Sequence, residues 1–294
     1  MWRLAMLLSV WTVVLLPGCT GSTKDRAKPT TSQAAKADET PPIVMKTGNE
    51  PFDSLLDGKL IDLTHSFDAD TIYWPTEQGF RFEKGNNGLT SKGYYYAANR
   101  FATAEHGGTH LDAPIHFAAD RKTADQIELR QLIGEAAVID VVSQCTADPD
   151  YLIGVGDLRA WEVKHDRRLE NVILLLRTGW SQHWPDRLKY LGTSAFGVEA
   201  VAQLHFPGLA PEAAKWLVDH RSVKAIGIDT ASIDYGQSSQ FESHVTLCGH
   251  NVPIFENLAS LDQLPSAGSL VIALPMKIAG GSGGPLRIVG IVRP

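Results

Sequence analysis

Six short runs of apolar residues restrict the fold of this chain more than any other feature. Each run is four to six residues long and rich in valine, isoleucine or leucine, as expected for strands buried on both faces of a sheet. Helical patterns lie between them: residues 211–218 begin with proline and carry one apolar face, and residues 155–161 and 196–204 are further candidates. Strands that alternate with helices predict an α/β domain with a mixed sheet. The six runs are Leu60–Leu63, Ala137–Val142, Val172–Leu176, Ala225–Ile228, Leu270–Leu274 and Ile288–Val292.

The start of the chain has the pattern of an export signal. A short basic start is followed by a mainly apolar stretch of 13 residues, Leu4–Leu16, shorter than the roughly 20 that a membrane-spanning helix requires. The next positions, Leu16-Pro17-Gly18-Cys19, resemble the bacterial lipobox, in which cleavage precedes a lipidated cysteine. We therefore expect residues 1–18 to be a lipoprotein signal peptide and Cys19 to be lipidated, which attaches an exported protein to a bacterial membrane. An ordinary signal peptide and an uncleaved anchor are the alternatives.

Residues 19–50 differ in composition from the rest of the chain. They are mainly threonine, serine, alanine, lysine and proline, with few apolar side chains to bury, which predicts a flexible tether. No second linker or internal repeat follows, so residues 51–294 are expected to form one folded domain. Within it, Cys145 and Cys248 are expected to be buried thiols, with a disulfide between them as the alternative.

Charge and cysteine content exclude several classes of function. The chain has 27 lysines and arginines and 33 aspartates and glutamates, a net charge of −6, and no basic stripe. This balance argues against nucleic acid as a partner. No two cysteines form a C-x-x-C pair, so a zinc ribbon is excluded and any metal must be held by histidines and carboxylates.

One segment, Glu105–Phe117, combines three histidines with an aspartate. All four occupy even-numbered positions, so an extended or looped chain would direct them to one point, whereas the glycines and proline of this segment oppose a helix. Imidazole and carboxylate ligands suit zinc, manganese or iron. The segment therefore predicts a metal site. The four residues are His106, His110, Asp112 and His116.

The same segment resembles the H-x-G-T-H-x-D-x-P-x-H-F signature of the cyclase family, which includes bacterial kynurenine formamidases and isatin hydrolases. Weaker similarities follow in the family's order over residues 58–292. They are Asp62–His65, Leu176–Trp180, Phe206–Ala214 and Gly227–Asp234, ahead of a late pair, His244 and Glu256. The resemblance implies a single α/β domain whose mixed, partly barrel-like sheet is flanked by helices, and it implies a homo-oligomer.

Roles for individual residues follow from the resemblance by position. It implies that His106, His110 and Asp112 bind one divalent metal. Asp112 would bridge to a second metal completed by His244 and Glu256, and since some members hold a single ion, we expect one or two, zinc or manganese. His116 corresponds to the family's general acid/base. The alternatives for His116 are a third imidazole ligand or a residue that orients the site.

The function implied is a metal-dependent amidohydrolase that cleaves a C–N bond of an aryl formamide or small cyclic amide. A divalent metal lowers the pKa of bound water to about 7, and a histidine can pass a proton to the leaving amine. Phe67 and Trp74 are candidates for an apolar wall against a flat substrate, and His65 for a group that orients the site. A non-catalytic metal- or solute-binding lipoprotein and a dehydratase or cyclase are the alternatives.

A glycine-rich stretch, residues 280–284, matches the G-x-S-x-G pattern of a nucleophile elbow. That motif requires a helix after the serine, but a strand pattern follows. A serine hydrolase of this type also needs a later acid and histidine, and neither follows Ser282. We interpret the stretch as a mobile turn near the active site.

Overall fold

A computed structural model describes residues 57–293 of the chain. The predicted signal peptide, the predicted lipidation site Cys19 and the predicted tether lie outside the described residues. No helix within residues 57–293 combines the length and apolar character that crossing a membrane requires.

Seven strands of an eight-stranded sheet close into a barrel. The order is β1-β12-β11-β5-β7-β9-β10-β4, and the ring closes because β12 pairs with β4 as well as with β11 and β1. Strands β5, β7, β9 and β10 run parallel, and the other pairings are antiparallel. The predicted mixed, barrel-like sheet is therefore confirmed. The strands are β1 (Lys59–Asp62), β4 (His110–Asp112), β5 (Ile133–Asp140), β7 (Ile173–Arg177), β9 (Ala225–Ile228), β10 (Ile254–Glu256), β11 (Ala267–Pro275) and β12 (Gly283–Val292).

Side chains alternate between two apolar layers along the parallel strands. In β5, Ala136 and Val138 join a cluster to which every strand of the barrel contributes, and which therefore fills its interior. Ala137 and Ile139 face the other way and pack against helices. Burial on both faces is why these strands are continuous apolar runs in the sequence.

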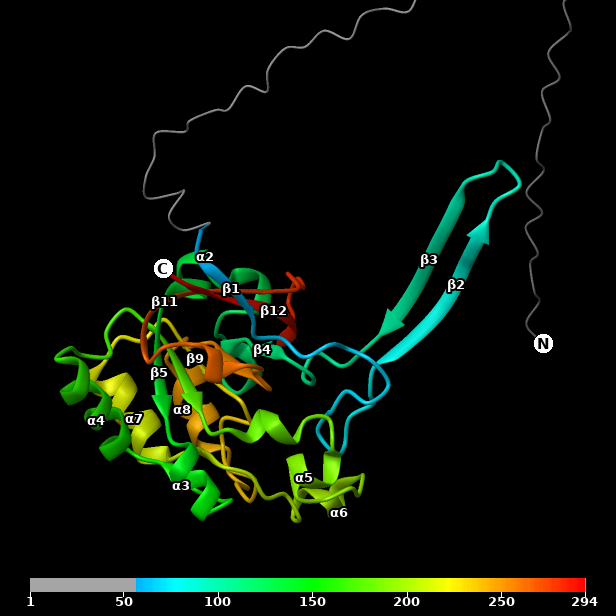
Figure 1. The fold of residues 1–294 in the computed structure, drawn as a ribbon. Coiled ribbons are helices and arrows are strands. Elements are labelled where there is room, and N and C mark those ends of the chain that lie inside the picture. The colour runs from blue at the N-terminus through cyan, green and yellow to red at the C-terminus, as the bar shows by residue number, and fades with distance from the viewer. Residues whose placement is uncertain (1–56, 294) are drawn as a thin grey trace, which may run out of the picture. The chain divides into compact units, whose positions relative to one another are not determined.

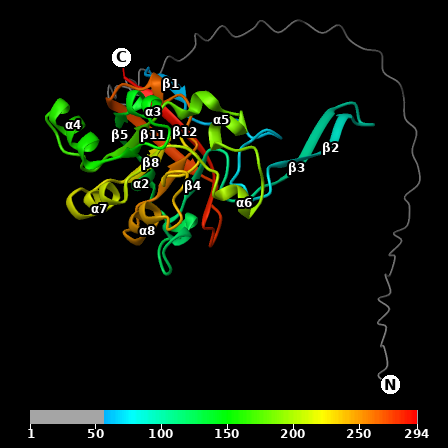
Figure 2. The same ribbon diagram turned by 90° about the horizontal axis from the view of Figure 1, so that it is seen from below.

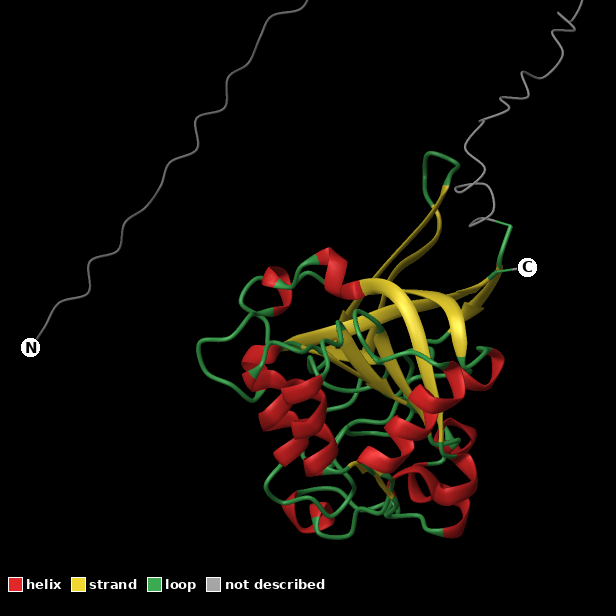
Figure 3. Cartoon of the chain, turned by 90° about the vertical axis from the view of Figure 1, so that its left-hand side faces the viewer, coloured by secondary structure: helices red, strands yellow, loops and turns green. Residues whose placement is uncertain are grey.

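Three helices cover the outer face of the parallel strands: α4 (Val155–His165), α7 (Pro211–His220) and α8 (Glu242–Gly249). In the view of Figure 3, most of the helices lie below the barrel strands or to their left. The predictions at 155–161 and 211–218 are confirmed, and both helices run a little further. The prediction at 196–204 was too long, because Gly197, at φ +87°, precedes a helix of four residues, α6 (Val198–Val201).

The remaining elements are short. The sequence predicted a strand up to residue 142, but β5 ends at Asp140, whose side chain accepts the Val142 N–H where α3 begins. Cys145 and Cys248 are both buried and unpaired. The other elements are α2 (Leu129–Leu132), α3 (Val142–Ala147), α5 (Arg187–Leu191), the paired β6 (Leu152–Ile153) and β8 (Gly208–Leu209), and the 3-10 turns η1 (Pro114–His116), η2 (Ala124–Gln126), η3 (Trp180–His183) and η4 (Leu261–Gln263).

A two-stranded antiparallel ribbon, β2 (Arg81–Leu89) and β3 (Tyr95–Ala102), projects from the barrel and its helices. Both perpendicular views show it extending into solvent away from the other elements (Figures 1 and 2). Phe82 and Phe101 pair across the ribbon, and these side chains are 55% and 53% exposed. The sequence analysis did not predict this ribbon, since glycines and asparagines interrupt its apolar pattern.

Candidate metal centre

The strand β4 supplies two of the predicted ligands to one face of the sheet. Leu111 points into the barrel interior, so its neighbours His110 and Asp112 point to the opposite face. All three are buried. Nε2 of His110 lies 3.1 Å from Oδ1 of Asp112.

His106 and His116 reach the same point by backbone that is not strand. His106 precedes a glycine turn in which Gly107 (φ +151°) and Gly108 (φ +57°) adopt conformations that favour glycine. A side chain at Gly108 would lie 2.6 Å from the ring of Phe67, so the turn is also too tight for one. His116 ends the 3-10 turn η1, which Pro114 begins. Of the extended or looped backbone predicted, only residues 110–112 are strand.

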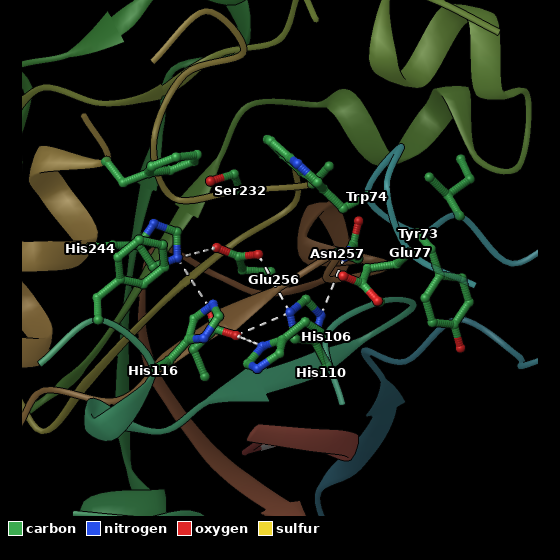
Figure 4. A pocket seen from close by; sticks show the side chains of 16 residues that line it. Tyr73, Trp74, Glu77, His106, His110, His116, Ser232, His244, Glu256 and Asn257 are labelled. Atoms are coloured by element: carbon green, nitrogen blue, oxygen red, sulfur yellow. Dashed lines mark hydrogen bonds and ion pairs between the residues drawn. The ribbon is translucent and has the colours of Figure 1, made fainter. Parts of the chain in front are cut away.

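Asp112 joins this group to two residues from distant elements. Its Oδ1 lies 2.6 Å from Nδ1 of His106, and its Oδ2 lies 3.2 Å from Nε2 of His244 on α8. Nε2 of His244 is also 3.1 Å from Oε1 of Glu256 on β10. The structure thus forms two candidate ligand groups that share Asp112. Figure 4 shows the other members of these groups facing one another. The groups are His106, His110 and Asp112, and Asp112, His244 and Glu256.

Outer hydrogen bonds fix how these ligands face one another. Nδ1 of His110 lies 2.9 Å from the Gly108 carbonyl oxygen, and Nδ1 of His244 lies 2.6 Å from Oδ2 of the buried Asp234. Both rings therefore present Nε2 to the carboxylates. Oε1 of Glu256 accepts the Ile233 N–H at 2.7 Å. Such partners set the tautomer and the basicity of ligands in metal sites.

The pKa values show how strongly this cluster attracts positive charge. Burial disfavours the charged form of His110, but the nearby carboxylates Asp112 and Glu256 outweigh it and raise its pKa to about 9. Burial and the Asp112 charge raise the pKa of Glu256. Two buried carboxylates and three imidazoles, with ligand atoms within 4.8 Å of one another in each group, are a donor set that fits divalent cations.

His116 lies beside the ligand groups and belongs to neither of them. Its ring stacks on His106, with centroids 3.7 Å apart. Burial is the main cause that lowers its pKa to about 4, partly opposed by the Asp112 charge. The ring is therefore neutral near pH 7 and faces the same pocket as the ligands.

A pocket of about 200 Å³ opens over the cluster. One wall is aromatic: the rings of Trp74 and Phe241 are 6.1 Å apart, and those of Phe241 and Phe117 are 5.3 Å apart. Figure 4 shows Trp74 and Glu77 on the opposite side of the pocket from His244. An apolar wall above a polar floor suits a flat substrate with one polar group to be attacked.

Of the three residues predicted on the substrate side, the structure brings only Trp74 into the lining of the pocket. Phe67 does not line the pocket, and its ring packs against Gly108. His65 stacks on Trp184 at 4.2 Å and lines a separate cavity, so the structure does not bring its side chain to the cluster.

Comparison with known proteins identifies the family. The model of the family described as "Putative cyclase" matches residues 61–235. The chain belongs to this family. An isatin hydrolase of Roseibium aggregatum is 31% identical over 210 residues, which are 69% of this chain and 77% of that protein. A kynurenine formamidase of Bacillus cytotoxicus is 28% identical over 241 residues, which are 80% of this chain and 97% of that protein.

Solved structures of the cyclase family have the same fold. Isatin hydrolase A from Ralstonia solanacearum superposes with a TM-score of 0.75 at 31% identity, covering 87% of this chain and all of that one. An isatin hydrolase bound to the product analogue thioisatinate has a TM-score of 0.73 at 27% identity, covering 83% of this chain and 97% of that one. The fold and the family expected from the sequence are both confirmed.

Several pocket residues of this cyclase-family chain were missed. Asn257 directly follows the predicted ligand Glu256, and its Nδ2 donates to the Gly108 carbonyl oxygen at 2.8 Å. Its position next to a predicted ligand could have identified Asn257 from the sequence. Glu77 and Phe241 also line the pocket, and each lies only three positions from a predicted residue, Trp74 and His244 respectively.

Proposed function

We propose that this chain is a metal-dependent amidohydrolase that cleaves a C–N bond of an aryl formamide or small cyclic amide. The observation that carries the proposal is the pair of ligand groups sharing Asp112, placed under an aromatic wall with His116 beside them. The names of the relatives, isatin hydrolase and kynurenine formamidase, support this substrate class.

The residues of the pocket can each be assigned a role in such a reaction. A divalent metal, zinc or manganese, supplies a water of lowered pKa and polarises the carbonyl group when bound. His106, His110, Asp112, His244 and Glu256 would hold one or two ions. The neutral His116 ring takes a proton from the attacking water and returns it to the leaving amine. Trp74 packs against the flat face of the substrate.

The position of His116 favours hydrolysis over a non-catalytic metal- or solute-binding protein. A metal carrier has no use for a half-buried imidazole that faces the pocket without belonging to a ligand group, whereas a hydrolase needs a proton carrier there. A dehydratase or cyclase reaction would use the same groups, so substrate turnover has to separate these reactions.

The test is to measure metal content and turnover together. The full chain is purified without chelator, its zinc and manganese are measured, and hydrolysis of N-formylkynurenine and isatin is followed. Bound metal with turnover of either compound is the expected result. A chain that binds neither metal, even after both are added back, would overturn the proposal. Metal without turnover of these or a wider set of amides and lactones would favour the binding-protein alternative.

We also propose export and lipid attachment at Cys19, which rest on the sequence pattern of residues 1–19. A pocket that takes a small amide would then act outside the cytoplasm. Mass spectrometry of the N-terminal peptide from expressing cells tests this. A diacylglyceryl group on Cys19 is expected, and an unmodified cysteine or an intact residue 1 would contradict it.

Self-association is proposed through the β2–β3 ribbon, with a second copy of this chain as its partner. The ring of Phe80 stacks on those of Phe82 and Phe101, and it contacts the ring of Phe67 edge to face. Phe67 in turn packs against Gly108, so a row of aromatic rings extends from Gly108 onto the ribbon. A two-stranded ribbon has no core of its own and is marginally stable in water, so its exposed rings call for a covering surface.

Charge complementarity favours a second copy as that surface. Residues 81–102 carry four basic side chains and one acidic side chain, a net charge of +3, whereas the whole chain carries −6. The rest of the chain therefore carries −9, and the ribbon of one copy is attracted to the body of another. A twofold pair would exchange two such contacts at once.

A further inference from the structure

The glycine-rich turn at residues 280–284 is hydrogen-bonded to the segment that carries the candidate ligand His106. Oγ of Ser282 lies 2.9 Å from Nε2 of His106 and 2.5 Å from Oε2 of Glu105. The Ser282 N–H also donates to Oε2 of Glu105, at 3.0 Å. The backbone joins as well, because the Ser282 carbonyl oxygen accepts the Ala113 N–H at 2.8 Å. Residues separated by more than 160 positions thus form one hydrogen-bonded unit.

The glycines on either side of Ser282 are required by this contact. A side chain at Gly283 would lie 2.6 Å from Cε1 of His106 and 2.5 Å from the Leu111 carbonyl oxygen. A side chain at Gly281 would lie 2.8 Å from Oε1 of Glu105. The glycines allow the turn to approach the histidine closely, which is a packing requirement that a mobile turn would not have.

The direction of each hydrogen bond can be assigned from the donors available. The Ser282 hydroxyl donates its single proton to Oε2 of Glu105, the same oxygen that accepts the Ser282 N–H. The serine oxygen is then an acceptor toward His106, and Nε2 of that ring must carry the proton. A neutral ring then leaves its lone pair on Nδ1, where it would be available to a metal shared with Asp112, whose Oδ1 lies 2.6 Å away.

His106 therefore differs from the other two candidate histidine ligands. His110 and His244 are each held at Nδ1 and present Nε2, whereas His106 is held at Nε2 and presents Nδ1. A histidine that binds through Nδ1 brings the metal closer to its own backbone. The orientation of such a ring depends on the hydrogen-bond partner of its other nitrogen, and for Nε2 of His106 that partner is Ser282.

We propose that Glu105 and Ser282 are positioning residues that fix the tautomer of His106 and so set the affinity of the His106–His110–Asp112 group for its metal. The inference rests on the proposed function only in requiring that this group binds a metal. The glycine-rich turn acts on the metal site through His106 and forms no nucleophile.

The test compares metal affinity in three variants of the full chain. In Ser282→Ala and Glu105→Ala, the dissociation constant for zinc, measured by competition with a chromophoric chelator, should rise roughly 10- to 100-fold. Glu105→Gln should restore much of the affinity, because its amide oxygen still accepts from Ser282. Ser143→Ala removes an exposed hydroxyl far along the chain and is the matched control. Thermal unfolding checks that all variants fold.

Nitrogen NMR of the zinc-loaded chain with labelled histidine gives a readout that stability alone would not move. In the unaltered chain, His106 should bind zinc through Nδ1 with a proton on Nε2, and Ser282→Ala should broaden or lose that Nε2 proton signal. Unchanged zinc affinity in both alanine variants, or binding through Nε2, would overturn the inference alone. An unaltered chain that binds no metal would overturn the proposed function as well.

Discussion

The rings of His106 and His116 stack with their planes 16° apart, although only His106 belongs to a group of candidate metal ligands. Two imidazoles with different proposed roles are thus stacked face to face. The stacking holds His116 against the pocket without drawing its nitrogens into the ligand set.

Replacing His116 with alanine should therefore separate chemistry from metal binding. We expect kcat to fall by roughly 10²- to 10⁴-fold because the proton carrier is lost, with metal content unchanged. Steady-state kinetics and metal analysis on the same sample check this. A normal kcat would contradict the role given to His116, and a loss of metal would make it a ligand.

Asp112→Asn should lose metal and activity together. Both ligand groups depend on this carboxylate, and an amide of the same shape removes the charge that they share. We expect less than one tenth of the metal bound by the unaltered chain, measured after dialysis against metal-free buffer. Asp62→Asn, which changes an exposed aspartate on β1, is the control. Retention of both metal and turnover in Asp112→Asn would contradict the shared-ligand arrangement.

Trp74→Ala should raise KM for an aromatic amide more than it lowers kcat. Removing a ring from the pocket wall removes apolar contact with the substrate, for which we expect roughly a tenfold change. Phe67→Ala is the comparison, since that ring packs behind Gly108 and outside the pocket. Equal KM values for Trp74→Ala and the unaltered chain would remove Trp74 from the substrate contact.

His65 should make the fold less stable in mild acid. Burial lowers its pKa to about 4, below its usual 6.5, so between these values the unfolded chain binds a proton that the folded chain does not. Stability contributed by the neutral ring is present above 6.5 and falls as the pH drops toward 4. At pH 5 this loss is at most about 2 kcal/mol.

Urea unfolding at pH 7 and pH 5 measures this loss directly. His65→Gln should show a smaller drop between the two pH values than the unaltered chain, whatever its stability at pH 7. His250→Gln, at an exposed position, should leave the drop unchanged. An identical drop in His65→Gln would show that its burial does not set the acid response.

Glutamates on the ribbon should break self-association. In the double variant Phe82→Glu/Phe101→Glu, the exposed aromatic pair is lost and the ribbon charge falls, so we expect monomers where the unaltered full chain forms dimers or larger species. Sedimentation equilibrium checks this. Val163→Glu, at a side chain that is 83% exposed on α4, is the control. A monomeric unaltered chain, or an oligomer that survives in the double variant, would contradict the proposal.

Much of the fold was predictable because the parallel strands are buried on both faces. Runs such as Val172–Leu176 have no polar alternation, and this pattern has few explanations besides an interior strand. The strand β4 was visible through its ligands and not through its pattern, since it has only three residues. The β2–β3 ribbon was missed because burial does not shape its sequence.

The candidate site was predictable where its residues are neighbours in sequence. His106, His110 and Asp112 lie close together in the chain, so their convergence required only local geometry. His244 and Glu256 needed the family resemblance, because spacing alone gives no reason to bring them to Asp112. The strand predicted after Ser282 is present as β12, but the contact of Ser282 with His106 depends on barrel closure, which no local pattern describes.

The pairing of β12 with β4 closes the barrel, and it joins Gly283 to Asp112 across most of the described chain. Contacts between such distant positions close a long loop of chain, and the entropy cost of this closure makes them slow to form. We therefore expect His106 to be held by Ser282 only once this pairing has formed. Uptake of the proposed metal should then report on completion of the native structure, since a chain in which β12 has not paired with β4 would lack the complete ligand groups.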